Sequence, residues 1–184
     1  RLVRSVCAPL EKASGVQVDY LPLQPAQPFP FPWPFLGFFR IFPETVLMRP
    51  QPLLPLQVDA HKRYDLIILA YQVWFLSPSL PVTSFLASPE AAKLCKDTPV
   101  VTLIGCRNMW LMAQEKVKAK LTELGARLID NIALTDACGT AASFLATPLW
   151  MFTGRQKPYS WVPRAGIEER EIVAASRFGS AMAQ

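Results

Sequence analysis

The stretch that decides the fold is Tyr64–Pro81, which reads YDLIILAYQVWFLSPSLP. It opens with the run Asp65–Ala70, which is apolar after its first residue, and continues into an aromatic loop closed by two prolines. A strand that is apolar on both faces is typical of a parallel sheet covered by helices. Ligands of open parallel sheets bind at the carboxyl ends of the strands. We therefore expect Tyr71–Pro78 to be a ligand-binding loop.

A membrane-spanning helix is the alternative for this stretch. The segment Leu66–Ala87 carries no charge and is long enough to cross a bilayer as a helix. However, Pro78 and Pro81 lie in its second half, and two prolines so close together would break a lone spanning helix. The buried strand is the better interpretation.

Composition predicts one globular domain over residues 1–184, with 51% hydrophobic residues to build a core. Because the chain starts at Arg1 and stops at Gln184 within a helical pattern, we expect it to be a piece of a longer protein. The four cysteines form no C-x-x-C pair, which favours a reducing cytoplasm. The single histidine, His61, excludes sites that need several imidazoles, and the pattern contains no metal cluster.

The net charge of +5 suggests an anionic partner, but the basic residues are scattered and form no nucleic-acid-binding module. A polyanionic cofactor or an acidic carrier protein would suit this surface.

The rest of the chain alternates strands and helices. Strand starts lie about 30 residues apart, which predicts βα units and a parallel α/β sheet. We expect helices at 1–14, 82–86 (a single turn), 88–96, 110–124 and 167–182, and strands at 16–23, 65–70, 98–105 and 126–134. Gly179 should allow the last helix to pack closely against the sheet.

Two segments interrupt this alternation, a Pro- and aromatic-rich arm at 24–60 and a second insertion at 137–165. Proline excludes regular helix or strand through most of the arm and favours extended chain. So many large rings would not be left exposed to water without a reason. The arm could pack over the core, act as a lid over an apolar substrate through Phe31, Trp33 and Phe35, or contact a membrane surface.

The strand and loop at Tyr64–Phe85, the segment Gly105–Asn108 and the C-terminal helix resemble the corresponding parts of flavodoxin-like oxidoreductases. More closely, Phe31–Phe35, Tyr71–Pro78 and Cys106–Trp110 resemble flavodoxin-like proteins labelled dialkylresorcinol condensing enzyme. The resemblance implies a doubly wound parallel sheet of order 2-1-3-4-5, an FMN cofactor, and oxidative aromatisation of a cyclic dione to a resorcinol in bacterial aryl-lipid biosynthesis. The central first strand and the phosphate-binding loop of such proteins would precede Arg1. We therefore expect that about 15–25 upstream residues belong to the protein.

The resemblance also assigns site residues. It places Tyr71 and Arg107 at the reaction, Tyr71 as a proton acceptor for a substrate enol, and Arg107 or Asn108 at the pyrimidine end of the flavin. Cys106, between a strand and a helix, should have a lowered thiol pKa. Trp74 and Phe75 could instead be ordinary core aromatics, and Arg107 a solvated loop charge. The residues implied in flavin binding are Tyr71, Gln72, Val73, Trp74, Phe75, Ser77, Pro78, Gly105, Cys106, Arg107, Asn108 and Met109.

Three functions remain open from the sequence. The first is an FMN-dependent oxidoreductase for an apolar cyclic or quinonoid substrate, with the arm as its lid. The second is a flavodoxin-type electron carrier, against which the +5 charge counts because such carriers usually have acidic surfaces. The third is a flavin-free interaction subunit whose arm docks on an acyl-carrier protein, a ketosynthase or a membrane. A homo-oligomer and at most peripheral membrane contact are expected.

Overall fold

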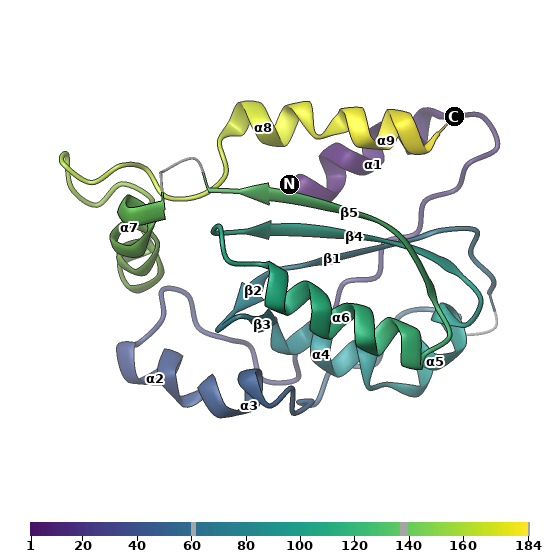
Figure 1. Ribbon diagram of the computed structural model, residues 1–184, viewed down its shortest axis with the longest axis horizontal. Helices are drawn as coiled ribbons and strands as arrows, with labels where there is room; N and C mark the ends of the chain where they lie inside the picture. The colour runs from purple at the N-terminus through teal and green to yellow at the C-terminus, as the bar shows by residue number, and fades with distance from the viewer. Residues whose placement is uncertain (60–61, 137–139, 184) are drawn as a thin grey trace.

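The computed structural model describes residues 1–59, 62–136 and 140–183. Its centre is a parallel sheet of three strands in the order β1-β4-β5, formed by Ile67–Tyr71, Pro99–Cys106 and Arg127–Thr135. Tyr71 pairs with Ile104, and Cys106 pairs with Thr135, so the carboxyl ends of all three strands lie at one edge (Figure 1). The predicted α/β class and these three parallel strands are confirmed.

Helices cover both faces of the sheet (Figure 1). Alternate strand residues point to opposite faces. Leu69 and Ile104 pack with α4 (Leu80–Leu86), α5 (Pro89–Cys95) and α6 (Leu111–Glu123). Leu103 and Leu134 pack with α1 (Leu2–Lys12), α8 (Glu169–Ala174) and α9 (Ser176–Met182) on the other face. The apolar runs of the strands are therefore buried from both sides, as the sequence predicted.

Local signals place the helix ends as expected. Ser88 caps α5, because its Oγ accepts a hydrogen bond of 3.1 Å from the backbone N–H of Ala91. Pro89 occupies the first turn of the same helix, where its missing N–H costs nothing. Gly125 follows α6 with a φ of +72°, a conformation that suits glycine after a helix.

Two expectations at the ends of the chain are wrong. Residues 16–23 form no strand; Leu21 and Leu23 pack onto the main core instead, so their alternation reflects the packing of an unpaired segment. The single helix expected at 167–182 is two, α8 and α9, which meet at Ala175. Gly179 does permit close packing, but against Val6 of α1 rather than against the sheet.

Both interruptions contain helices that the sequence analysis did not predict. The arm includes α2 (Phe35–Arg40) and α3 (Phe42–Val46), so the exclusion of helix was wrong for this part. The reason is that Pro34 is the N-cap of α2 and Pro43 lies in the first turn of α3, positions where proline starts helices. The second interruption contains α7 (Thr140–Thr153), which continues through Pro148.

No helix in the described part of the chain combines the length and apolar character needed to cross a bilayer. The predicted ligand-binding loop is a tight hairpin of β2 (Val73–Trp74) and β3 (Ser77–Pro78). His61 and Cys138 lie outside the described residues.

Candidate functional site

The β2–β3 hairpin holds two adjacent side chains in an unfavourable backbone conformation. Phe75 and Leu76 form its turn with φ angles of 48° and 58°. Such left-handed angles at both central residues match the hairpin twist but strongly favour Gly, Asn or Asp. Backbone strain of this kind persists only where the surroundings fix it, and it concentrates at functional sites. Two contacts fix it here: the N–H of Ser79 donates to the carbonyl of Gln72 (2.9 Å), and Lys116 donates to Ser77 (2.7 Å).

The rings of Trp74 and Phe75 face the arm. The Trp74 ring lies edge-on to those of Phe29 (5.1 Å between centroids) and Trp33 (5.9 Å). The Phe75 ring lies 4.6 Å from that of Phe38 and is also edge-on to Phe42 at 5.0 Å. Such pairs stabilise packing beyond the area they bury. The arm is therefore packed on the hairpin, and both rings are half-buried by it.

The arm also packs against α7, far away in sequence. The N–H of Trp33 donates to the carbonyl of Met151 (2.8 Å), and the rings of Phe35 and Phe152 are 5.3 Å apart. We call the two segments, residues 29–46 and 140–153, the aromatic cap. Figure 1 shows α2 and α7 at the end of the molecule where the strands terminate. Of the three residues proposed as a lid, Trp33 is half-buried in the cap, whereas Phe31 and Phe35 are exposed.

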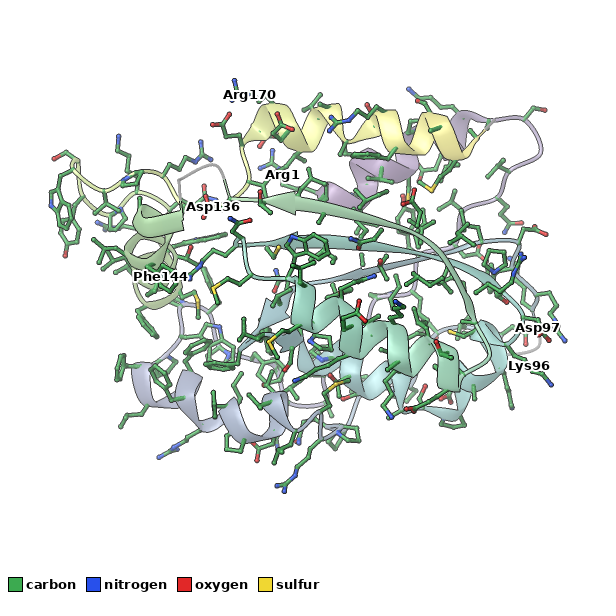
Figure 2. All side chains as sticks on the ribbon, in the orientation of Figure 1. Arg1, Lys96, Asp97, Asp136, Phe144 and Arg170 are labelled. Carbon is green, nitrogen blue, oxygen red and sulfur yellow. The ribbon has the colours of Figure 1, made fainter. Side chains whose placement is uncertain are left out.

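The second predicted loop, Gly105–Met109, begins with the last two residues of β4 and lies beside α7 (Figure 1). The guanidinium carbon of Arg107 lies 4.1 Å from the centre of the Phe144 ring, a cation–π contact that fixes the charge at the edge of the sheet. Figure 2 labels Phe144 on α7, beside the end of this strand. Asn108 and Met109 are exposed. The loop therefore has an exposed asparagine and an exposed methionine next to a held cation.

The expectation of a lowered pKa for the Cys106 thiol is wrong. Burial raises the pKa of its thiol to about 11, above the ordinary 9.0. The expected lowering required a helix N-terminus at this position, but α6 begins only at Leu111 and Cys106 is the last residue of β4. Its thiol is therefore protonated at neutral pH.

Tyr71 points into the core rather than towards the edge of the sheet. Its hydroxyl donates to Oε1 of Gln114 (2.7 Å), and the Gln114 amide donates to Oγ1 of Thr102 (3.0 Å). Thr102 in turn donates to Oδ1 of Asn131 (2.8 Å). Burial raises the pKa of the Tyr71 hydroxyl above its ordinary value of 10.0. The chain of hydrogen bonds satisfies buried polar groups between the sheet and α6.

The sequence analysis missed two residues of this region. Gln114 lies on the stripe formed by Trp110, Ala113 and Val117, and a polar residue on an apolar stripe was the available signal. Asp136 follows β5, and its carboxylate accepts from the N–H of Gly166 (3.1 Å) and from Thr147 (3.4 Å). Figure 2 places Asp136 at the same edge as Phe144. Asp136 thus ties the end of the sheet to α7 and to the segment after it.

The remaining first-loop residues lie as follows. Gln72 is exposed directly after β1, Val73 is half-buried in β2, and Ser77 and Pro78 are buried in β3. Two shallow depressions, of about 220 and 210 Å³, lie along residues 51–57 of the arm, and no residue assigned to flavin binding lines either. Among the described residues, His, Cys, Asp and Glu form no group of three or more that could hold a metal ion.

Comparison with known proteins adds no family to these observations. No family model matches the chain, and no curated protein or solved structure is significantly similar to it. The function must therefore be argued from the edge of the sheet itself.

Proposed function

We propose that this protein is an FMN-dependent oxidoreductase that acts on an apolar cyclic or quinonoid substrate. A cyclic dione that is aromatised to a dialkylresorcinol in aryl-lipid biosynthesis is one such substrate. In this proposal β1, β4 and β5 are the third, fourth and fifth strands of a flavodoxin-like sheet of order 2-1-3-4-5. The observation that carries the proposal is the exposure of two amides, Gln72 and Asn108, after neighbouring parallel strands and beside the aromatic cap.

The residues at this edge suit the polar rim of a flavin ring. A carboxamide both donates and accepts hydrogen bonds, as the flavin pyrimidine requires. When bound, FMN supplies the capacity to accept a hydride from the substrate. Arg107, held against Phe144, adds a fixed positive charge near the position where negative charge would develop. We assign no residue of this chain to binding the phosphate of FMN.

The aromatic cap has the composition needed to bind an apolar substrate and exclude water. Phe31 and Phe35 present exposed rings, whereas Trp74 and Phe75 form the wall beneath them through contacts to Phe29 and Phe38. Tyr71 has a structural part in this proposal, because its hydroxyl is buried and bound to Gln114. The proton of an enol substrate would then pass to solvent or to another group of the substrate itself.

The test is FMN binding, followed by flavin reduction. We expect added FMN to lose fluorescence and to shift its visible absorption in the presence of the protein. The double variant Gln72→Ala/Asn108→Ala should weaken binding about tenfold or more, as loss of two hydrogen bonds predicts. Gln57→Ala, at another exposed glutamine, is the matched control. An apolar cyclic dione should bleach the flavin anaerobically, since two electrons and two protons pass from the dione to FMN.

A flavin-free interaction subunit is the second candidate, and one observation favours it. The rings of Trp74 and Phe75, which would stack on a flavin, are in contact with the arm. In this alternative the cap would dock on an acyl-carrier protein or a ketosynthase. No change in FMN fluorescence even at saturating protein would reject the oxidoreductase and leave this alternative.

A further inference from the structure

Large apolar side chains are exposed at the end of the molecule that carries the aromatic cap. Helix α2 presents Phe35 and Leu36, which are 61% and 69% exposed, and Phe39 follows one turn later. After α7, Trp161 is 69% exposed and stacks with Tyr159 at 5.9 Å between ring centres. A soluble surface rarely gathers this much apolar area without a partner.

These two groups belong to one surface. The packing of Gly154 against Pro32, and the hydrogen bond from Trp33 to Met151, hold the start of the 154–166 segment beside the arm. Figure 1 shows this segment, α7 and α2 at the end where β4 and β5 terminate, with α7 between the other two. Figure 2 shows side chains from all three projecting outwards there. We call this surface, residues 35–49 and 144–164, the end face.

The charge of the end face has a single dominant sign. Residues 140–166 contain no Asp or Glu but three basic residues, Arg155, Lys157 and Arg164, all exposed. On the arm, Arg40 and Arg49 are exposed, whereas the acidic residue between them, Glu44, is half-buried. The exposed charge around the apolar side chains is therefore positive.

We propose that the end face binds the surface of an anionic lipid bilayer. Exposed Phe and Leu side chains insert at the boundary of headgroups and acyl chains, and Trp and Tyr rings favour the same depth. Surrounding Arg and Lys side chains are attracted to anionic headgroups. A protein partner would require matching shape, whereas a bilayer requires only this combination of apolar centre and basic rim. The proposal is independent of flavin binding.

Vesicle flotation tests this proposal on the whole protein. We expect it to float with phosphatidylcholine vesicles containing 30% phosphatidylglycerol, to bind about tenfold less to pure phosphatidylcholine, and to be released by high salt. Leu36→Asp/Trp161→Ser should lose flotation by about tenfold or more, because both apolar anchors are removed. Arg155→Gln/Lys157→Gln should lower binding to anionic vesicles only.

The matched control is Ile129→Asp, because Ile129 is 57% exposed on β5, near the opposite end of the sheet. It should float like the parent protein, and circular dichroism should show that all variants fold. Absence of flotation with anionic vesicles overturns the proposal. Equal loss in Ile129→Asp also overturns it. The proposal is also overturned if a second copy of the protein covers the end face. That outcome is recognised by a dimer that Leu36→Asp/Trp161→Ser dissociates, together with no vesicle binding by the parent protein.

Discussion

The Nζ atom of Lys116 lies 2.7 Å from Oγ of Ser77 and 3.1 Å from the carbonyl oxygen of Val46. One ammonium group on α6 therefore joins β3 of the hairpin to the end of α3 in the arm. Both contacts are partly buried, where hydrogen bonds to a charge are stronger than in water. The arm is consequently attached to α6 and the hairpin by a polar contact as well as by its aromatic rings.

Replacement of Lys116 by Met should lower the free energy of unfolding by about 1.5–3 kcal/mol, the usual value for hydrogen bonds to a charged group. Denaturant unfolding measures the loss. The control is Lys118→Met on the same helix, where an exposed ion pair with Glu115 at 3.7 Å should be worth about 0.5 kcal/mol or less. Equal losses in both variants would contradict this account of Lys116.

Gly179→Ala should destabilise the protein by about 3 kcal/mol or more, because its Cβ atom would lie 1.9 Å from the backbone carbonyl oxygen of Val6. The two helices would have to separate. Gly37→Ala is the comparison, because its nearest neighbour would be a Pro34 side-chain atom at an ordinary 3.5 Å. That variant should be neutral or more stable by up to about 1 kcal/mol, as alanine favours helix. Thermal unfolding of both variants distinguishes the two sites.

At the hairpin turn, a glycine variant should be more stable than an alanine variant, the reverse of their usual order. At Leu76, with φ of 58°, the Gly variant should be more stable than the Ala variant by about 1 kcal/mol. Both variants lose the same leucine side chain, so the difference reports the backbone. At Leu36, in helix α2, the order should be the ordinary one, with Ala better by about 1 kcal/mol. The same order at both positions would argue against the turn geometry.

Alkaline pH should weaken the fold through its buried thiols. Burial raises the pKa of Cys95 from 9.0 to about 11, and Cys106 shifts in the same direction to the same value. The unfolded chain therefore loses these thiol protons first. The stability that the buried, protonated thiols contribute is complete below pH 9 and is lost as pH rises towards 11. For Cys95, which is almost fully buried, the loss should be about 2 kcal/mol by pH 10.5.

The measurement is denaturant unfolding under reducing conditions at pH 8 and pH 10.5. Tyrosines and lysines also titrate in this range, so the quantity of interest is the difference between the parent protein and Cys95→Ala. The variant should lose less stability between the two pH values. An identical pH dependence in both would show that this thiol ionises freely in the folded protein.

The sheet could be predicted from sequence because its signals are local. The runs Ile67–Tyr71 and Pro99–Cys106 are apolar on both faces, and Ser88, Pro89 and Gly125 mark helix ends with side-chain or backbone chemistry. The helices of the arm and of residues 137–165 were missed because the prolines of these two segments were taken only as helix breakers. Pro34 and Pro43 start helices, and Pro148 lies within one.

The candidate site was predictable only in part. Strand pairing brings Gln72 and the Gly105–Met109 loop to one edge, which follows from the order of the strands. Tyr71 contacts Gln114, and Trp74 contacts Phe29 and Trp33. These tertiary contacts join segments that are distant in sequence. No local pattern specifies such contacts.

The crossing of α1 and α9 at Val6 and Gly179 also has a consequence for synthesis. The face of the sheet that carries Val101 and Leu103 is covered by α1, α8 and α9. A ribosome that has made β1, β4 and β5 still holds a chain whose apolar sheet face lacks α8 and α9. The nascent protein is therefore most prone to aggregation in the interval before residues 169–182 emerge, when the sheet is exposed and the chain cannot yet close.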